Sequence, residues 1–514
     1  NFMGKDVTYA QTDSLSQAFA AYLQGLGLVK GDRIAIMMPN VPQYPVAVAG
    51  ILRAGLVVVN VNPLYTPREL EHQLKDSGAK AIVIVENFAT TLEKCIAATP
   101  VKSVVLCSMG DQLGLLKGAL VNYMVRNVKK MVPAFNLPGA VRFNRAVAIG
   151  TSGTFTKPEI KADDVAVLQY TGGTTGVSKG AVLLHRNVIA NVLQSEVWND
   201  PVMKKVPAGE QPTGVCALPL YHIFAFTVGM MLAVRTGGKQ ILIANPRDIP
   251  GVLKELSKHT IHSFPAVNTL FNGLANHADF NTVDWSHLKI SVGGGTAVQS
   301  NVAKIWFEKT GCPICEGYGL SETSPSATCN PVTSTEYTGT IGVPLPSTFI
   351  KLLDDDGNEV PAGQSGEISI KGPQVMAGYW QRPDETAKVM TPDGFFKTGD
   401  IGVVDSRGYF KIVDRKKDMI LVSGFNVFPN ELEDVVSQLP GVLECACVGV
   451  VDAKSGEAVK LVIVKKDPNL SEADVRNFCK ENLTGYKQPK VVEFRTELPK
   501  TPVGKILRRE LRDK

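Results

Sequence analysis

Helical and strand-like patterns alternate along the first 85 residues, and this alternation limits the fold more than any other feature of the sequence. The helical patterns cover residues 14–26 and 43–54, and the strand-like runs cover 33–37, 56–60 and 81–85. Thr66 and Glu69 form a capping box with Pro67 at the first helical position, which predicts another helix that reaches about Lys75. Strands that alternate with helices predict an α/β fold with doubly wound, mainly parallel sheets.

The pattern changes in the last third of the chain. Residues 338–410 contain short β segments separated by turn signals such as Asp356-Gly357, which predict a small β-barrel. A charged connector, DRKKD, occupies residues 414–418, and a compact α/β pattern follows it to the end. We therefore expect a large N-terminal part and a smaller C-terminal α/β part.

A loop rich in glycine and threonine, YTGGTTGVSKG, occupies residues 170–180 after an apolar run. Glycines let backbone N–H groups converge on an anion, and the hydroxyl groups and Lys179 add donors and charge, so the loop predicts a polyphosphate site. The Walker pattern does not fit, because two residues separate Gly176 from Lys179. A surface hairpin without a ligand remains the alternative.

The same loop also matches the G-x-S-x-G pattern of a nucleophile elbow at residues 176–180. An elbow needs a helix directly after its serine, here Ser178. Residues 181–184 instead predict a second strand, so the loop is expected to connect two strands. This expectation disfavours a serine hydrolase.

Composition and cysteine usage are those of an ordinary globular protein, with 44% hydrophobic residues in 514. The longest uncharged apolar run, residues 223–234, is shorter than the ~20 residues that cross a bilayer. The first residues lack an apolar leader, and the nine cysteines form no regular framework, so we expect reduced thiols and a cytoplasmic protein. One C-x-x-C pair, Cys312 and Cys315, offers too few ligands for a structural zinc site.

Residues 113–132 predict a basic amphipathic helix. At 100° per residue, one face collects Leu120, Val121, Met124, Val125, Val128, Met131 and Val132, and the other collects Arg126, Lys129 and Lys130. Two interpretations stay open. The apolar face packs on the protein core while the basic residues face water, or the helix docks on an anionic membrane surface.

Three further segments carry polar residues among apolar ones. His222 lies in the aromatic run PLYHIFAF, residues 219–226, which we interpret as part of a strand region. The segments SVGGGTAV, residues 291–298, and EGYGLSET, residues 316–323, follow apolar strands, where open α/β sheets bind ligands. Each of these signals is weak by itself, and a buried histidine is more often structural than functional.

Together and in this order, these segments resemble the adenylate-forming enzymes, which include acyl-CoA synthetases, luciferases and the adenylation domains of peptide synthetases. The resemblance rests on the phosphate loop, His222, EGYGLSET, TGD at 398–400, DRKKD, and PKTPVGKILRREL at 499–511. It covers nearly the whole chain. It implies an N-terminal domain of residues 1–414, a hinge at 415–417, and a mobile C-terminal domain at 418–514.

Within this superfamily the sequence is most similar to the bacterial long-chain fatty-acyl-CoA synthetases. Residues 393–417, DGFFKTGDIGVVDSRGYFKIVDRKK, resemble their signature DGWLHTGDIGxWxPxGxLKIIDRKK. Most of the differences exchange one apolar residue for another, whereas Lys397 and Ser406 are departures that packing does not explain. The implied activity is a long-chain fatty-acid–CoA ligase that feeds fatty-acid β-oxidation.

The implied chemistry needs ATP, because a free carboxylate has no good leaving group. The acid would attack the α-phosphorus of ATP, forming acyl-AMP and releasing pyrophosphate, and the sulfur of CoA would then attack the carbonyl and expel AMP. No protein nucleophile is required, so catalysis would consist of positioning and of neutralising phosphate charge. Mg²⁺, ATP and CoA are the implied cofactors.

The resemblance assigns catalysis to Lys505, Glu322 and His222. Lys505 would reach the carboxylate and the α-phosphate together, and His222 and Phe226 would border the fatty acid. Thr171 and Glu322 would hold Mg²⁺, which prefers oxygen ligands.

The resemblance also assigns a nucleotide site and a CoA channel. The triphosphate would contact Thr171, Gly172, Gly173, Thr174, Thr175, Gly176 and Lys179. Adenine would lie among Gly293, Gly294, Gly295, Glu316, Gly317, Tyr318 and Gly319. Thr323, Asp400 and Arg415 would contact phosphate and ribose, Lys417 would lie at the hinge, and Gly424 and Phe425 would line the pantetheine channel.

The expected partners are a fatty acid, ATP and CoA, with no nucleic acid. A homodimer and reversible contact with the inner face of the cell membrane are compatible with the sequence. The alternatives are a medium-chain or aryl acid–CoA ligase, an α/β-hydrolase thioesterase that uses Ser178, and a fatty-acid-binding protein without catalysis. The last alternative predicts loss of Lys505, Glu322 or Asp400, and all three are present.

Overall fold

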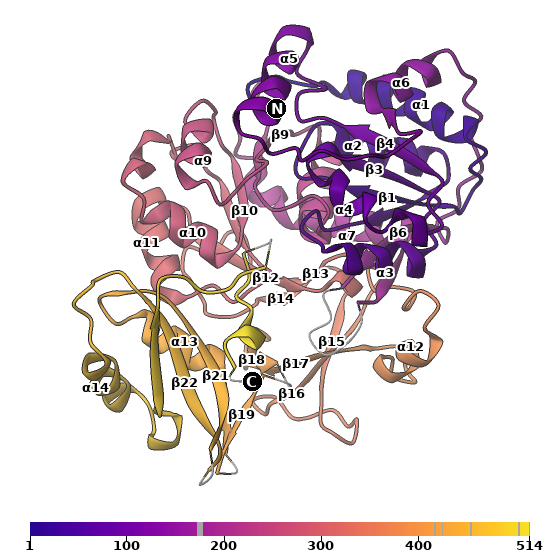
Figure 1. The fold of residues 1–514 in the computed structure, drawn as a ribbon. Coiled ribbons are helices and arrows are strands. Elements are labelled where there is room, and N and C mark those ends of the chain that lie inside the picture. Colours follow the sequence, from indigo (N-terminus) through magenta and orange to yellow (C-terminus); the bar gives the residue numbers. More distant parts are fainter. Residues whose placement is uncertain (172–177, 416–417, 424, 453–454, 502–503, 513–514) are drawn as a thin grey trace.

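The computed structural model describes residues 1–171, 178–415, 418–423, 425–452, 455–501 and 504–512. Two α/β regions form the indigo-to-magenta and pink parts of Figure 1, and a smaller antiparallel sheet follows in orange. The C-terminal region, in yellow, lies below the pink region in this view. Within the described residues, no helix combines the length and the apolar character that crossing a bilayer requires.

The first sheet has seven strands in the order β5–β4–β3–β1–β2–β6–β7 and is parallel except where β6 meets β7. Their bounds, in this order, are Val141–Arg142, Ser103–Cys107, Ala81–Val85, Arg33–Met37, Val57–Asn60, Val165–Tyr170 and Gly180–Leu184. Every residue of β2 and β3 is buried, because helices cover both faces of the sheet. This explains why these strands read as continuous apolar runs.

The helices of this region are α1 (Tyr9–Gly25), α2 (Gln43–Arg53), α3 (Pro67–Ser77), α4 (Ala89–Glu93), α5 (Leu115–Tyr123), α6 (Phe143–Thr151) and α7 (His185–Met203). The predicted capping box is present at the start of α3. The Thr66 amide donates to Glu69 Oε2 at 2.8 Å, and the Glu69 amide donates to Thr66 Oγ1 at 3.4 Å. The predicted strands at 33–37 and 81–85 match β1 and β3 residue for residue.

The second sheet also has seven strands, in the order β14–β13–β12–β11–β10–β8–β9. Their bounds, in this order, are Val343–Pro344, Ser326–Cys329, Ile314–Gly319, Ile290–Gly293, Ser263–Ala266, Thr213–Cys216 and Lys239–Leu242. Helices α8 (Leu232–Thr236), α9 (Ile249–Leu256), α10 (Asn268–Ala275) and α11 (Ser300–Thr310) belong to this region. Its core contains stacked aromatic rings, with Phe264 and Trp306 5.5 Å apart.

Two expectations for the middle of the chain are wrong. Residues 219–226 do not form a strand, because β8 ends at Cys216 and the chain turns at His222 into the π-helix η4 (Ala225–Met231). The barrel predicted at 338–410 is an open four-stranded antiparallel sheet in the order β15–β16–β17–β18, whose outer strands do not pair within the described residues. The bounds are Phe349–Leu353, Gly366–Lys371, Phe396–Val404 and Phe410–Arg415, with α12 at Pro383–Val389.

The C-terminal region has its own hydrophobic core. Its five strands are β19 (Ile420–Val422), β20 (Phe425–Val427), β21 (Val442–Asp452), β22 (Gly456–Lys465) and β23 (Val491–Arg495), and its helices are α13 (Pro429–Ser437) and α14 (Glu472–Asn482). Core clusters here begin at Ile420, whereas the large cluster of the preceding regions reaches no further than Ile412. The chain therefore divides its apolar core near the charged connector.

Residues 113–132 form α5 and the π-helix η3 (Met124–Val128), and their orientation contradicts the first of the two sequence interpretations. Leu120, Val128 and Met131 are exposed, so the interpretation that this face packs on the core is wrong. Arg126 does not lie free in solvent either, because it pairs with the buried Glu86.

Candidate active site

The ends of the predicted phosphate loop lie between two antiparallel strands. The Thr171 amide donates to the carbonyl of Lys179 at 2.9 Å, and Ser178 Oγ donates to the carbonyl of Thr171 at 2.5 Å. Strand β7, and not a helix, follows Ser178, so the geometry of a nucleophile elbow is absent here. The loop residues Gly172, Gly173, Thr174, Thr175 and Gly176 lie outside the described residues.

Lys179 is bound by two side chains that the sequence reasoning missed. Its Nζ lies 2.6 Å from Glu385 Oε2 and 4.8 Å from the ring centre of Tyr379. Hydrogen bonds from Lys179 and Lys388 lower the pKa of Glu385 to about 2. Since Glu385 comes from α12, about 200 residues away in sequence, only the fold brings it to the loop.

Tyr379 also connects Lys179 to the predicted metal ligand. Its hydroxyl donates to Glu322 Oε1 at 2.8 Å, and burial together with the charge of Glu322 raises the pKa of Tyr379. Glu322 is buried, and its backbone carbonyl accepts the amide of Met376 at 2.8 Å. The buried carboxylate of Glu322 can supply an oxygen ligand to Mg²⁺. The nearby loop lysine can bind the phosphate oxygens that Mg²⁺ would share.

Tyr318 and Asp400, predicted for adenine and ribose, are in direct contact. The Tyr318 hydroxyl donates to Asp400 Oδ2 at 2.7 Å, and Asp400 is buried. Strand pairing sets Asp400 opposite Arg415, so the backbones of the two predicted ribose residues are neighbours in β17 and β18.

The two glycine segments also meet. Gly293 ends β11, and Gly317, Tyr318 and Gly319 end the neighbouring strand β12. A Cβ at Gly294 would lie 2.9 Å from the Phe224 ring, and Gly295 has φ +79°, so both positions favour glycine. Glu316 lies in this slot, where its Oε1 accepts the Val298 amide at 3.2 Å and burial raises its pKa to about 8.

The side chain of Thr323, predicted to contact the α-phosphate, is fully buried. Its Oγ1 accepts the Leu320 amide at 2.9 Å and donates to the carbonyl of Pro325. The hydroxyl proton is therefore used within the turn, and the phosphate contact stays a prediction.

The segment before His222 is fixed by amide side chains of the first region. Asn40 Nδ2 donates to the carbonyl of Leu218 at 2.9 Å, and Gln169 Nε2 donates to the carbonyl of Tyr221 at 3.1 Å. Asn40 and Gln169 are buried, and no sequence signal marked them as neighbours of the site. Phe226 is buried one helical turn after His222 and donates its amide to the His222 carbonyl at 3.0 Å.

Lys505 reaches this site from the C-terminal region. Burial and the nearby charge of Lys505 lower the pKa of His222 to about 4, so the imidazole is neutral at neutral pH. The loop that carries Lys505 is docked on the N-terminal part: Thr269 Oγ1 donates to the carbonyl of Gly504 at 3.0 Å, and Arg247 Nη2 donates to the carbonyl of Thr501 at 3.2 Å.

The residues predicted for the hinge and the CoA channel are only partly described. Lys417 and Gly424 lie outside the described residues. Phe425 is 56% exposed, and its ring stacks on Tyr486 at 4.8 Å. Arg508 links the two sides of the connector, because it pairs with Asp414 at 3.4 Å and with Glu433 at 2.7 Å.

Two other features could be taken for sites. Glu210, His262 and His287 place ligand atoms within 4.8 Å of one another. However, the Thr213 amide donates to His262 Nδ1 at 3.1 Å, so the neutral imidazole carries its proton on Nε2, which faces Glu210 at 3.2 Å. That nitrogen then has no lone pair for a metal.

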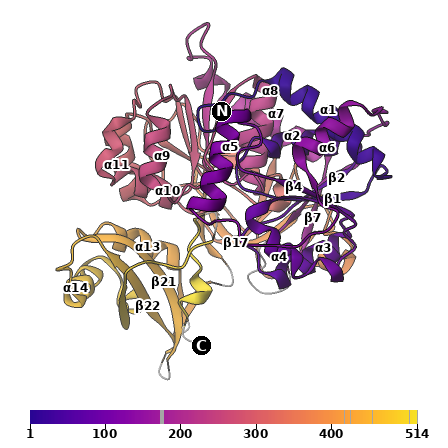
Figure 2. The same ribbon diagram turned by 45° about the horizontal axis from the view of Figure 1, so that its top comes forward.

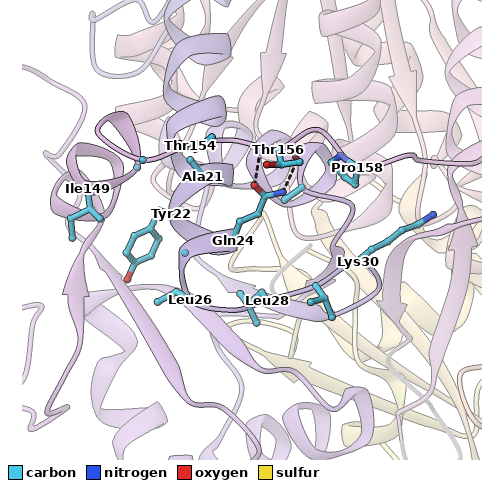
Figure 3. A pocket seen from close by; sticks show the side chains of 15 residues that line it. Ala21, Tyr22, Gln24, Leu26, Leu28, Lys30, Ile149, Thr154, Thr156 and Pro158 are labelled. Atoms are coloured by element: carbon cyan, nitrogen blue, oxygen red, sulfur yellow. Dashed lines mark hydrogen bonds between the residues drawn. The ribbon is translucent and has the colours of Figure 1, made fainter.

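The second feature is a surface groove of about 680 Å³ between the ends of α1 and α6 (Figure 3). Two hydrogen bonds between Gln24 and the backbone of Thr156 hold one wall in place. The lining contains no carboxylate, histidine or cysteine, and its Lys30 pairs with Asp164 at 2.7 Å. This groove contains none of the predicted site residues.

Comparisons with known proteins identify relatives along the whole chain. A family profile described as AMP-binding enzyme matches residues 1–380, and one described as AMP-binding enzyme C-terminal domain matches residues 431–505. A long-chain-fatty-acid–CoA ligase of Escherichia coli O6:H1 is 57% identical over 512 residues, which are 99% of this chain and 90% of the relative. The Bacillus subtilis enzyme of the same name is 38% identical over 518 residues, with coverage of 99% and 90%.

Solved structures give the same result for the fold. The anthranilate CoA ligase AuaEII in complex with anthranoyl-AMP matches with a TM-score of 0.87 and 25% identity, covering 99% of this chain and 92% of that one. ATP-bound MatB from Rhodopseudomonas palustris matches with a TM-score of 0.82 and 29% identity, covering 99% and 94%.

Proposed function

The chain belongs to the AMP-binding enzyme family of adenylate-forming acid–CoA ligases, and on this basis we propose that it joins long-chain fatty acids to CoA at the expense of ATP. The observation that supports this substrate class is the 57% identity to a long-chain-fatty-acid–CoA ligase over nearly the whole chain. The product, an acyl-CoA thioester, would feed fatty-acid β-oxidation.

The site geometry supports a division of the first half-reaction among three groups. Glu322, oriented by the Tyr379 hydroxyl, would hold Mg²⁺ together with Thr171 and the phosphates. Lys179 and the loop beside it would bind the triphosphate, which would compete with Glu385 for the ammonium group. Mg²⁺ would neutralise charge on the phosphate oxygens when bound.

Lys505 and His222 would act at the reacting carboxylate. The positive charge of Lys505 lowers the pKa of His222, which indicates that the two side chains are near each other. From this position Lys505 would stabilise the negative charge that develops on the α-phosphate and the acid. A neutral His222 adds no charge and would border the carboxylate, with Phe226 next along the acyl chain. Asp400, held by Tyr318, would accept hydrogen bonds from the ribose hydroxyls.

The second half-reaction would require the C-terminal domain to move. We propose a hinge at residues 415–417 between a domain of residues 1–414 and a domain of 418–514, which the separate hydrophobic cores support. Rotation would withdraw Lys505 and bring Gly424 and Phe425 to the pantetheine of CoA. In this proposal, the ion pairs of Arg508 with Asp414 and Glu433 hold the connector in the arrangement that places Lys505 near His222.

The expected setting is the cytoplasm, with reversible contact between the enzyme and the inner face of the cell membrane. Long-chain acids partition into membranes, so surface contact would raise their local concentration. A homodimer is compatible with this arrangement. Medium-chain or aryl acids remain the alternative substrates, and a feruloyl-CoA synthase of Amycolatopsis with 32% identity, covering 99% of this chain and 94% of its own, is a relative of that kind.

The proposed first half-reaction predicts exchange of labelled pyrophosphate into ATP that depends on added palmitate or oleate. Ser178→Ala should retain this exchange, because the hydroxyl only donates to the Thr171 carbonyl in our interpretation. Exchange without added acid, or CoA release from palmitoyl-CoA that Ser178→Ala abolishes, would favour a different enzyme.

A further inference from the structure

Helix α5 packs on the protein through small and polar residues and through one apolar side chain, Val121, which lies against the core. A Cβ at Gly118 would lie only 2.4 Å from the backbone carbonyl oxygen of Gly110, so the close contact requires glycine. One turn later, Asn122 Oδ1 accepts the Gly110 amide at 2.8 Å. After another turn, Arg126 Nε pairs with the buried Glu86 Oε1 at 2.8 Å. The face toward the protein is therefore fixed by close backbone contact, a hydrogen bond and an ion pair.

The opposite face of α5 and η3 turns large apolar side chains away from the protein. Leu115 is 94% exposed, Leu116 90% and Leu120 61%. Tyr123, Val128 and Met131 continue this face and are more than half exposed. We call these six residues the α5 surface. Figure 2, in which α5 comes to the front, shows that the helix lies at the outside of the molecule.

Such an arrangement is unusual for a helix of a globular protein. Amphipathic helices normally direct their leucines to the core, and a contiguous exposed apolar face marks an interaction site. The exposed leucines take no part in this packing, because the contacts of the helix with the protein come from Gly118, Val121, Asn122 and Arg126. The occupant of the α5 surface must come from outside the described residues.

The charge around the α5 surface identifies the class of occupant. Residues 112–158 contain no Asp or Glu, and they contain seven basic residues, which are Lys117, Arg126, Lys129, Lys130, Arg142, Arg145 and Lys157. Arg126 and Arg142 both pair with Glu86, whereas Lys129 and Lys130 are exposed directly beside Val128 and Met131. An apolar face with lysines at its border fits the headgroup boundary of an anionic bilayer.

A second copy of the chain fits this surface less well. Two α5 surfaces facing each other would bring lysines of like charge together without an acidic residue of the same segment to pair with them. The combination of exposed leucines and bordering cations therefore favours lipid over protein.

We infer that the α5 surface docks on anionic lipid bilayers, with Leu115, Leu116 and Leu120 entering the headgroup boundary and Lys129 and Lys130 facing lipid phosphates. Arg126 holds the helix in its orientation through Glu86 and does not face the lipid. This inference deepens the proposed membrane contact and rests on it. Its test measures binding without turnover, so its failure would leave the proposed ligase activity untouched.

The test is co-sedimentation of the full chain with vesicles of phosphatidylglycerol mixed with phosphatidylcholine, and with vesicles of phosphatidylcholine alone. Leu115→Gln, Leu116→Gln and Leu120→Gln together should lower the partition coefficient on anionic vesicles more than about a hundredfold, because three leucines no longer leave water. Lys129→Glu with Lys130→Glu should lower it at least about tenfold. Wild-type binding should weaken in high salt and on the uncharged vesicles.

Matched control variants test whether vesicle binding is specific to the α5 surface or arises from any exposed apolar or basic residue. Val29→Gln, Val197→Gln and Val451→Gln replace three exposed apolar residues elsewhere, and Lys204→Glu with Lys205→Glu reverses another adjacent exposed pair. Both control variants should bind anionic vesicles like the wild type, and all four variants should keep pyrophosphate exchange with a soluble acid. Equal binding by the leucine variant and the wild type would overturn the inference, as would a wild-type dimer in sedimentation equilibrium that the leucine variant abolishes.

Discussion

Glu316 lies among the glycines of the predicted nucleotide slot, and its pKa is far from that of an ordinary glutamate. The residue is 6% exposed, and burial raises the pKa of its carboxyl group from the ordinary value of 4.5 to about 8, although the hydrogen bond from the Val298 amide lowers it. At neutral pH the group is therefore mostly protonated. A neutral carboxyl group can donate a hydrogen bond, which a carboxylate cannot.

This shift predicts that the folded chain loses stability as the pH rises from about 4.5 to about 8. Between pH 4.5 and about 8 the folded chain holds a proton that the unfolded chain has released, so the free energy of unfolding falls as pH rises through this window. Glu316→Gln should remove this loss of unfolding free energy, which is on the order of 5 kcal/mol for the shift from 4.5 to about 8. In thermal melts, the melting temperature of the variant relative to the wild type should rise between about pH 5 and about pH 9. A constant difference across that range would contradict the assignment.

Glu385 predicts an effect on ATP binding. In the structure its carboxylate holds Lys179 at 2.6 Å, and the triphosphate would have to compete for that ammonium group. Both side chains are 29% exposed, so solvent screens the pair and it is weak. Glu385→Gln should therefore lower the KM for ATP by up to about fivefold with little change in kcat.

The control for this prediction is Lys388→Gln, which removes the other partner of Glu385 and leaves Lys179 bound. It should leave the KM for ATP near the wild-type value. A higher KM in Glu385→Gln would mean that the carboxylate orients Lys179 for ATP instead of competing with it.

At the scale of single residues, the sequence predicts which residues belong to the site only where they lie in recognisable motifs. Tyr318 and Asp400 were assigned to one site from separate motifs, and they are in contact. Tyr379, Glu385, Asn40 and Gln169 were not predicted, because each acts through a contact between segments far apart in the chain. A tyrosine or an asparagine without a motif carries no signal of its partner.

At the scale of elements, the loop that carries Lys505 gives the clearest prediction. Thr269 and Arg247 hold it on the N-terminal part, and the proposal assigns the ammonium group of Lys505 to the first half-reaction. Lys505→Ala should slow acyl-AMP formation at least about a hundredfold, because removal of a charge that stabilises the transition state costs this much. Thioester formation from supplied acyl-AMP should change far less, and an equal loss in both assays would rule out domain alternation.

The proposed hinge predicts the opposite pattern. Proline fixes the backbone φ angle, so Lys417→Pro should hinder the rotation that follows adenylation. Acyl-AMP should form at a rate near that of the wild type, while its conversion to acyl-CoA slows. Stopped single-turnover reactions can measure both steps, and unchanged thioester formation would remove Lys417 from this role.

Elements with strong local patterns were predicted well, and elements decided by tertiary contacts were not. The apolar strands β1 and β3 and the capped start of α3 follow from local sequence. The segment around His222 has the aromatic content of a strand, yet Asn40 and Gln169 hold it as a turn before η4. The orientation of α5 could not be predicted either, because the buried Glu86 that captures Arg126 lies 40 residues earlier.

At the scale of the whole molecule, the N-terminal and C-terminal parts are two bodies with separate hydrophobic cores, and the proposed active site draws residues from both. The residues predicted to bind the nucleotide belong mainly to the first body, and Lys505 comes from the second. Several contacts between them are hydrogen bonds, such as that of Ser300 with Asp434 at 2.9 Å, and polar contacts of this kind can be exchanged at little cost in free energy. The architecture is therefore suited to alternate between two half-reactions.

The most direct test of the central claim is the formation of CoA thioesters from a series of acids between butyrate and stearate, with benzoate and ferulate included. We expect kcat/KM to rise with chain length, since each buried methylene adds about 0.8 kcal/mol of binding. AMP and pyrophosphate should appear in equal amounts with each thioester. A maximum at short or aromatic acids, or thioester formation with release of ADP, would contradict the proposal that this chain is a long-chain fatty-acid–CoA ligase acting through acyl-AMP.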